Sequence, residues 1–447
     1  MARIYPFRAF CYNPERVGSL ENVATQPYDK ITAEMQTRYY NLSPYNLARI
    51  IKGRTEPGDD ERENVYTRAT RYLEAWKREG ALVQQPEPAI FPYFQEYEVP
   101  GTREKRVRKG FIALGQIEKY EARVVFRHEQ TLSAPKADRL ELLRHIRTHF
   151  GQIFMLFSDP ARAVDRLLQR AAAETPVIRV SDEYGTIHTV WRVAAPAAIA
   201  EFQQAMADKN LIIADGHHRY ETALIYRNEC RARLGTSDSN APHERVMMTF
   251  INTEAEGLTI LPTHRVVGGL KDFDFGAFRQ AASRYFDWYA YPFANESERP
   301  AALRQFRRDL ETRGQKRPAI GVYAEGESAA YLFLLKINAD LAEWLPDLSA
   351  AQRTLDIVLL HRLLLQNCLN ISEESVRREQ NIHYVREWEE AVERVTSGQA
   401  QVAFLLNPVR IEQVRDITFR GQVLPQKSTD FYPKLLSGLT GYCLDAP

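Results

Sequence analysis

Two histidines and an arginine follow an Asp-Gly pair at the end of a short apolar run. The run Leu211-Ile-Ile-Ala214 leads into Asp215-Gly-His-His-Arg219. We expect the run to be a strand and a helix to begin within the motif, because the residues from Tyr220 onward follow a helical pattern. The first N–H groups of a helix lack intrahelical partners and carry partial positive charge, so they favour anions. The motif therefore predicts an anion site, and a phosphoryl group is the obvious ligand.

Each residue of this motif has a structural role to weigh against the chemical one. Gly216 would let the backbone turn tightly and approach a ligand. Asp215 would either cap the helix or hold Mg²⁺ against phosphate oxygens. His217 and His218 could cap and pack a helix start without binding anything. Arg219 can donate two parallel hydrogen bonds to a phosphate, and its presence favours the phosphate interpretation.

A metal site is the alternative interpretation of the same residues. His217 and Glu221 are four positions apart, so a helix would place them on one face as ligands. A catalytic zinc site needs three protein ligands, and His128 or His264 could supply another, although no spacing requires it. A metal-dependent hydrolase that uses His217, His218 and Glu221 is therefore a competing hypothesis.

Two further segments could contribute to a site. His128-Glu129 follows a predicted strand, Ala122 to Phe126, and a glutamate at a strand end can act as a general base, although most such carboxylates are solvated. The basic, hydroxyl-rich residues of the second segment are a candidate second anion site, with a solvated loop as the commoner outcome; they are Lys427, Ser428, Thr429 and Lys434. His361 lies in an apolar helical pattern and is expected to be a core or interface residue.

The elements around these motifs predict a mixed α/β fold, because apolar runs typical of strands alternate with helical patterns. We expect an N-terminal α/β region over residues 1–115, a central region over 116–270 that carries the anion motif, and a C-terminal α/β region over 271–447. Lengths and composition agree with this division, since 447 residues with 44% hydrophobic content can form two or three cores.

Charge and cysteine content exclude several classes of protein. Fifty-nine Lys and Arg against 58 Asp and Glu give a net charge of +1, which argues against a chain-wide nucleic-acid surface. The four cysteines are far apart, which argues against a zinc knuckle or a disulfide framework. The sequence shows no signal peptide and no apolar run near the ~18 residues of a spanning helix, so we expect a soluble cytoplasmic protein. A homo-oligomer is compatible with this composition.

Over nearly its whole length the chain resembles the domain-of-unknown-function family numbered 1015. The residues that carry this resemblance are Tyr5-Pro-Phe-Arg-Ala-Phe10, Pro27-Tyr-Asp29, His128-Glu-Gln-Thr131, Ala214-Asp-Gly-His-His-Arg-Tyr220, Leu261-Pro-Thr-His-Arg265, Lys427-Ser-Thr429 and Tyr432-Pro-Lys434. The family name itself implies no reaction.

The His-Glu-x-Thr motif, followed later by Asp-Gly-His-His-Arg, is similar to the ParB/sulfiredoxin superfamily and especially to its nucleotide-dependent free-serine kinases. This resemblance implies that the central region over 116–270 is a ParB/sulfiredoxin-like nucleotide-binding domain, with ADP or ATP and Mg²⁺ as cofactors. It also implies that Glu129 is the base that activates the acceptor hydroxyl and that Asp215 is catalytic, with Mg²⁺ at Asp215. The implied nucleotide and phosphate ligands are His128, Thr131, Gly216, His217, His218 and Arg219.

The chain departs from the small kinases in two ways: it has roughly twice as many residues between the two motifs, and it adds large flanking regions. These departures leave the phosphoryl acceptor open. Our leading hypothesis is a nucleotide-dependent phosphotransferase that acts on a small hydroxylated metabolite such as serine. A nucleotide-binding switch protein without catalysis is the alternative that keeps the same phosphate site.

Overall fold

The computed structural model describes residues 1–129, 134–235 and 238–445. These residues form two compact units, the first containing Met1–Arg127, Thr131–Thr259 and Phe431–Pro447, the second His128–Gln130 and Ile260–Asp430. This division differs from the three regions expected from the sequence. The expected boundary after residue 115 falls inside strand β5 (Lys105–Gln116), which pairs on both sides within the first unit.

A mixed nine-stranded sheet organises the first unit. In the order of the sheet its strands are β6 (Val125–Arg127), β11 (Leu211–Asp215), β8 (Ile153–Phe157), β12 (Arg245–Asn252), β5, β4 (Phe91–Glu98), β10 (Ile187–Val190) and β9 (Ile178–Ser181), and β1 (Ile4–Tyr5) also pairs with β5. The β6–β11 and β8–β12 pairs are parallel, whereas β8–β11 and β5–β12 are antiparallel. The mixed α/β fold predicted from the sequence is confirmed.

Helices cover the apolar side of this sheet. Alternate residues of β8, namely Ile153, Met155 and Phe157, join one core cluster, as the two-residue period of a strand requires. The same cluster takes residues from α6 (Ala163–Ala171), α7 (Pro196–Met206) and α8 (His217–Leu234). This packing fixes α8 against the strand that precedes it.

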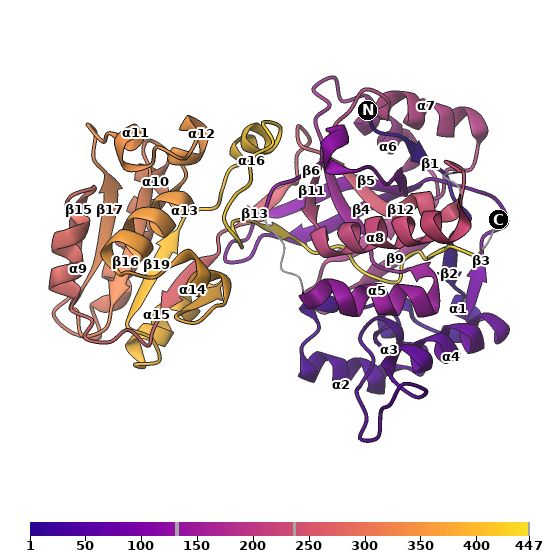
Figure 1. Cartoon of the computed structure of the whole chain (residues 1–447), viewed down its shortest axis with the longest axis horizontal. Coiled ribbons are helices and arrows are strands. Elements are labelled where there is room, and N and C mark those ends of the chain that lie inside the picture. Colours follow the sequence, from indigo (N-terminus) through magenta and orange to yellow (C-terminus); the bar gives the residue numbers. More distant parts are fainter. Residues whose placement is uncertain (130–133, 236–237, 446–447) are drawn as a thin grey trace. The chain divides into compact units, whose positions relative to one another are not determined.

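A second hydrophobic core cluster of the first unit is built mainly from four helices. These are α2 (Ala33–Leu42), α3 (Ala48–Ile51), α4 (Val65–Arg78) and α5 (Ala134–Ile146). Helix α5 runs beside α8 (Figure 1), and it begins and ends slightly earlier than the helix predicted from Lys136 to His149. His149 instead belongs to strand β7 (Thr148–His149), which pairs with β21 (Tyr442–Cys443) near the C-terminus.

Shorter elements complete the first unit. They are α1 (Pro14–Val17), β2 (Phe10–Tyr12), β3 (Leu82–Gln84) and the 3-10 helices η1 (Leu20–Asn22), η2 (Tyr28–Lys30), η3 (Tyr120–Ala122) and η4 (Pro242–Glu244). The short strands β13 (Thr259–Leu261) and β20 (Asp430–Tyr432) contain two of the points at which the chain passes from one unit to the other, and another follows Arg127.

The second unit contains a six-stranded antiparallel sheet with helices on both faces. Its strands, in the order of the sheet, are β15 (Phe286–Pro292), β17 (Ala329–Leu335), β16 (Ala319–Ala324), β19 (Val402–Leu406), β14 (His264–Val267) and β18 (Ile382–Val385). Ile320 and Val322 of β16 join one core cluster, whereas Ala319 and Tyr323 join another. Both faces of the sheet are therefore buried within this unit.

The helices of the second unit divide between these two clusters. Helices α10 (Arg299–Gly314) and α15 (Trp388–Thr396) pack on one face, and α9 (Phe275–Ala282), α13 (Asp356–Leu359), the π-helix η5 (Leu360–Cys368) and α16 (Ile411–Thr418) pack on the other. The remaining short helices are α11 (Leu341–Trp344), α12 (Ala350–Arg353) and α14 (Glu373–Arg377). Among the residues that the structure describes, no helix is long and apolar enough to cross a membrane.

The space around Gly110 shows how tightly the central strands of the first unit pack. It lies in β5 opposite Tyr93 of β4 and Ile251 of β12. A Cβ at this position would lie 2.5 Å from the carbonyl oxygen of Phe250 and closer still to Ile251 Cδ1. Because that carbonyl cannot move without disturbing the ladder, we expect Gly110→Ala to lower the free energy of unfolding by about 2 kcal/mol.

The change is measured by urea unfolding and by Tm. Gly53→Ala is the matched control. A Cβ added at Gly53 would have Val65 Cβ as its nearest neighbour, at 3.4 Å, which is an ordinary contact distance. Equal stability of the two variants would contradict the packing described for β5.

Candidate functional site

A strand, a one-residue turn and a helix position the Asp-Gly-His-His-Arg motif as the sequence predicts. Strand β11 ends at Asp215, and α8 begins at His217. Gly216 between them has a φ of 92°, a left-handed conformation that glycine adopts without strain. A Cβ on Gly216 would lie 3.0 Å from Arg219 Nε, so the glycine also makes room for the arginine.

A β-bulge changes the side of the sheet to which Asp215 points. Ile213 pairs with Met155 and Asp215 pairs with Phe154, so Ala214 is an extra residue on β11. Without the bulge, Asp215 would share the face of Leu211 and Ile213, which lie in the apolar core. The bulge therefore removes the carboxylate from that core, as bulges near functional sites commonly do.

Asp215 forms an ion pair with Arg219. The Nη2 atom of Arg219 donates to Asp215 Oδ2 at 2.5 Å, and Nη1 donates to the carbonyl oxygen of Gln152. The N-cap of α8 is Gly216, without a side-chain hydrogen bond, so the alternative in which Asp215 caps the helix is wrong. The carboxylate pairs with the guanidinium one turn into α8 and not with the backbone N–H groups at the start of the helix.

Further positive charges converge on Asp215. Lys434 Nζ lies 3.7 Å from Asp215 Oδ1, and Lys30 also interacts with the carboxylate. Burial alone would raise the pKa of Asp215, but Lys434, Arg219 and Lys30, together with His217, hold it well below its ordinary value. The carboxyl group is therefore ionised at neutral pH, with more cationic than anionic side chains around it.

The 3-10 helix η2 supplies another part of this site. Burial tends to lower the pKa of Arg219, but Asp215, Asp29 and Tyr28 raise it above its ordinary value. Arg219 thus stays charged. The sequence marks Pro27-Tyr-Asp29 through the family resemblance. It does not assign Lys30 to this site, because the charge interaction of Lys30 with Asp215 joins distant segments.

Two buried side chains hold the segment that carries Lys434. Arg108 is fully buried, and its Nη1 donates to the carbonyl oxygen of Tyr432 at 3.0 Å, while its Nη2 donates to that of Pro433. Gln95 Nε2 donates to the carbonyl oxygen of Lys434 at 2.9 Å. Burial lowers the pKa of Arg108 to about 10, which still leaves it charged at neutral pH. Lys434 is therefore fixed through its backbone.

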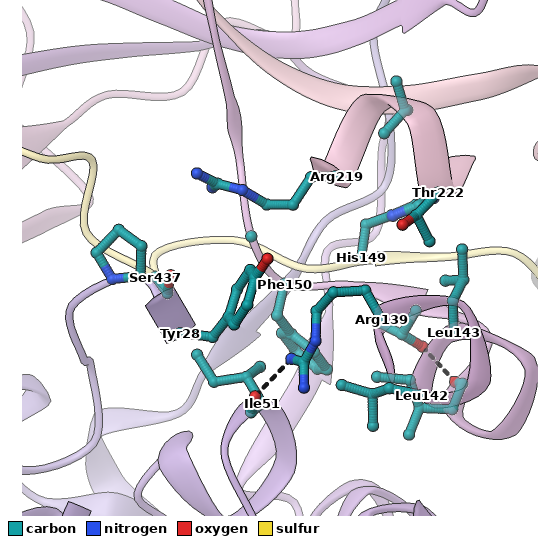
Figure 2. A pocket seen from close by; sticks show the side chains of 15 residues that line it. Tyr28, Ile51, Arg139, Leu142, Leu143, His149, Phe150, Arg219, Thr222 and Ser437 are labelled. Atoms are coloured by element: carbon teal, nitrogen blue, oxygen red, sulfur yellow. Dashed lines mark hydrogen bonds between the residues drawn. The ribbon is translucent and has the colours of Figure 1, made fainter. Parts of the chain in front are cut away.

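Arg219 also lines a cavity that opens to solvent, with about 620 Å³ of space between its atoms when the open solvent is included (Figure 2). Its lining residues are Pro27, Tyr28, Ile51, Arg139, Leu142, Leu143, Ile146, Thr148, His149, Phe150, Gly151, Arg219, Thr222, Val246 and Ser437. Arg139 lies over the ring of Tyr28 at 4.2 Å and donates to the carbonyl oxygen of Ile51 at 2.6 Å. All of these residues belong to the first unit.

The polar groups of the cavity wall are few. Thr222 is 4% exposed, and its Oγ1 makes no hydrogen bond within the described part of the chain. Burial lowers the pKa of His149 to about 4, so this imidazole is neutral at pH 7. A mostly apolar cavity with a few fixed polar groups is typical of small-molecule sites.

The structure does not support the metal-dependent hydrolase. Glu221 forms an ion pair with Lys136, and His264 Nδ1 accepts a hydrogen bond from the backbone N–H of Leu406 at 3.2 Å. Within residues 1–129, 134–235 and 238–445, no three His, Cys, Asp or Glu side chains are placed to hold a metal ion. The cluster of His217, His218 and Glu221 is therefore wrong as a metal site.

Glu129 and His128 belong to the second unit. Strands β6 and β11 are parallel, with Arg127 opposite Ile213, and His128 follows β6 directly in the chain. His128 Nε2 lies 2.7 Å from Thr429 Oγ1, and its carbonyl oxygen accepts from the N–H of Leu424. The Oε2 atom of Glu129 is buried and has no hydrogen-bond partner among the described residues. Thr131 lies outside the described residues.

The residues of the predicted second anion site belong to two different units, so this site stays a prediction. Ser428 Oγ donates to the carbonyl oxygen of Pro425 at 2.5 Å, and Thr429 is held by His128. The Ser428 hydroxyl group thus closes a local turn, whereas the Thr429 hydroxyl group contacts a residue far away in the sequence. Lys427 is exposed in the same turn, whereas Lys434 belongs to the first unit and lies at Asp215.

Arg265 is the buried centre of this part of the second unit. It is 1% exposed, and its Nη2 donates to the carbonyl oxygen of Lys427 at 2.8 Å. Its guanidinium lies 5.2 Å from the ring centre of Tyr384 and also interacts with Glu129. Burial, reinforced by Arg265, lowers the pKa of His361 to about 3, so this half-buried histidine is neutral. Arg265 therefore anchors the Lys427 turn beside Glu129.

A family model described as "Protein of unknown function (DUF1015)" matches residues 4–358. Because this match covers more than half of the 447 residues, the chain belongs to that family, and the sequence prediction of the family is confirmed. Among curated proteins, none matches this sequence.

Several solved structures are similar to this chain at low sequence identity. A conserved hypothetical protein from Pyrococcus furiosus is 12% identical, with 69% of this chain and 87% of that chain covered and a TM-score of 0.32. A free serine kinase in complex with AMP is 12% identical, with 69% and 83% covered and a TM-score of 0.33. SbnI with a C-terminal truncation, from Staphylococcus aureus, is 10% identical, with 75% and 89% covered and a TM-score of 0.35. At these TM-scores the likeness assigns no function to this chain, and the ParB/sulfiredoxin-like domain stays a prediction.

The ionised state of Asp215 predicts a pH-dependent contribution to stability. A carboxyl group whose pKa is lowered by folding stabilises the protein above its ordinary pKa of about 3.9, and this contribution is lost as the pH falls through the folded value. We expect Asp215→Asn to lower the free energy of unfolding by about 1–2 kcal/mol at pH 7, because three cations lose their shared partner. The deficit should shrink between pH 5 and pH 2.

Urea unfolding at several pH values measures this difference. Asp208→Asn is the matched control, since the Asp208 side chain is 71% exposed beside Lys209 and should contribute less than about 0.5 kcal/mol. A deficit of Asp215→Asn that stays constant down to pH 2 would show that its carboxylate is not stabilised by these charges.

Proposed function

We propose that this member of the DUF1015 family binds a nucleoside di- or triphosphate at the first turn of α8 and transfers a phosphoryl group to a small hydroxylated metabolite, with serine as the first candidate. One observation carries the proposal. Lys30, Arg219 and Lys434 come from three distant segments and act on one ionised carboxylate, Asp215.

This arrangement favours an anion with several charges. Three cations, Lys30, Arg219 and Lys434, exceed the two carboxylates Asp215 and Asp29. The first N–H groups of the 18-residue helix α8 add partial positive charge at the same place. The ion pair holds Arg219 in one orientation, so its remaining donor capacity is aimed before a ligand arrives. A chain of phosphate groups matches this distribution better than a single carboxylate does.

Asp215 also fits the magnesium ion that accompanies a nucleotide. Mg²⁺ is usually held by one or two carboxylates together with phosphate oxygens and water, not by a full cage of protein ligands. Asp215 is ionised and 24% exposed, so it can offer one oxygen. The ion would neutralise charge on the phosphates when the nucleotide is bound.

The transfer itself requires positioning and a base. The acceptor oxygen forms a bond to phosphorus while the bond from phosphorus to the bridging oxygen of the nucleotide breaks, and the hydroxyl proton passes to a carboxylate. The sequence motif assigns this carboxylate to Glu129. Its buried Oε2, which has no hydrogen-bond partner in the described part of the chain, supports the assignment because it has the capacity to accept a proton.

Lys434→Met tests the phosphate site. Loss of one cation beside Asp215 should weaken the binding of ADP or ATP with Mg²⁺ about tenfold, because a charge-assisted contact contributes about 1.5 kcal/mol or more. Isothermal titration calorimetry on the full chain measures the affinity. Lys427→Met, which removes an exposed lysine from the second unit, is the control and should bind normally. Wild-type protein that binds none of ADP, ATP and CTP would contradict the proposal.

Glu129→Gln tests the base separately. The amide cannot take the hydroxyl proton, so phosphoryl transfer should fall at least about 10²-fold while nucleotide affinity stays unchanged. Product formation from ATP or ADP with serine and other hydroxylated metabolites measures the transfer. Glu387→Gln, an exposed glutamate of the second unit, should retain full activity. Unchanged turnover in Glu129→Gln would remove Glu129 as the base, and nucleotide binding without any transfer would favour a switch protein.

A further inference from the structure

The cavity beside Arg219 contains a buried hydroxyl group that is not satisfied within the described part of the chain. Thr222 Oγ1 lies in the cavity wall with the side chain 4% exposed, and it makes no hydrogen bond to a described residue (Figure 2). Burying a polar group without a partner costs about 1–3 kcal/mol, so such groups are rare in folded proteins. A ligand that supplies the missing partner would recover this cost.

The remaining wall of the cavity favours a flat, mostly apolar group. Leu142, Ile146 and Phe150 supply apolar surface, and the ring of Tyr28 is held in place by Arg139 at 4.2 Å. The neutral imidazole of His149 can both donate and accept a hydrogen bond. A ring with hydrogen-bonding atoms at its edge suits these walls better than an aliphatic chain or a second phosphate.

Arg219 connects this cavity to the cationic site at Asp215. It lines the cavity and donates to Asp215 Oδ2. Arg219 and Thr222 are three residues apart on α8, so they lie on the same face of the helix. Thr222 is five residues beyond His217, about 7.5 Å along the axis of the helix at 1.5 Å per residue. That separation leaves room for a sugar between phosphates at the start of α8 and a ring at Thr222.

We propose that this cavity binds the nucleobase of the nucleotide and that Thr222 determines which base is accepted, through a hydrogen bond from its hydroxyl group to the edge of the ring. This inference rests on the proposed nucleotide binding and adds to it the location of the base. Sites that hydrogen-bond a ligand discriminate strongly, because a ligand without the matching group leaves the buried hydroxyl without a partner.

Binding of ADP, GDP, CDP and inorganic pyrophosphate to the full chain with Mg²⁺ tests the inference by calorimetry. We expect wild-type protein to bind one nucleoside diphosphate at least about tenfold more tightly than pyrophosphate. Thr222→Val keeps the shape of the side chain and removes the hydroxyl group. It should weaken the preferred nucleotide about five- to tenfold and leave pyrophosphate unchanged. Thr222→Ser keeps the hydroxyl group and should restore the preference among bases.

Thr189→Val is the matched control. Thr189 lies in β10 of the same unit and is 5% exposed, and its Oγ1 also has no partner among the described residues, but it does not line the cavity. This variant should bind every ligand as the wild type does. Pyrophosphate binding as tight as that of the nucleotides, or equal losses in Thr222→Val and Thr189→Val, would overturn the inference and leave the phosphate site standing. If neither nucleotides nor pyrophosphate bind, the proposed function itself fails.

Discussion

The ion pair between Asp215 and Arg219 is the interaction on which the site depends. It stabilises an ionised carboxylate at the end of a strand and orients a guanidinium one turn into α8. Gly216 permits the close approach of the two, and the bulge at Ala214 removes Asp215 from the apolar face of the sheet. Lys434 and Lys30 then add positive charge, so that three cations stand against the two carboxylates Asp215 and Asp29. An excess of fixed positive charge is what a phosphorylated ligand requires.

The positions of the distant cations follow from burial elsewhere in the first unit. Arg108 is buried and forms no ion pair with any residue that the structure describes, and it directs its donors at the carbonyl groups of Tyr432 and Pro433. Burying a charged group is costly unless it is well hydrogen-bonded, so this arrangement fixes the backbone next to Lys434. The packing of the sheet thereby fixes the backbone that places the Lys434 ammonium group beside Asp215.

The strand, the turn and the start of α8 could be predicted because contiguous residues encode them. The apolar run, the glycine and the helical pattern lie within about twenty residues. Lys30 and Lys434 could not be assigned to Asp215, because their contacts depend on the fold of distant segments. The hydrogen bonds of the segment near Lys427 could not be predicted, because composition cannot show that Ser428 closes a turn or that Thr429 contacts His128. The sequence also did not predict the division into two units. The expected boundary after residue 115 falls inside β5, and nothing in the sequence of β5 shows that this strand lies in the middle of a sheet.

A crystal structure of the protein with ADP and Mg²⁺ tests the central claim most directly. We predict that the phosphate groups lie within hydrogen-bonding distance of Arg219 and Lys434 and of the first N–H groups of α8. Phosphate groups bound elsewhere, with Asp215 and its cations arranged as they are here, would contradict the account.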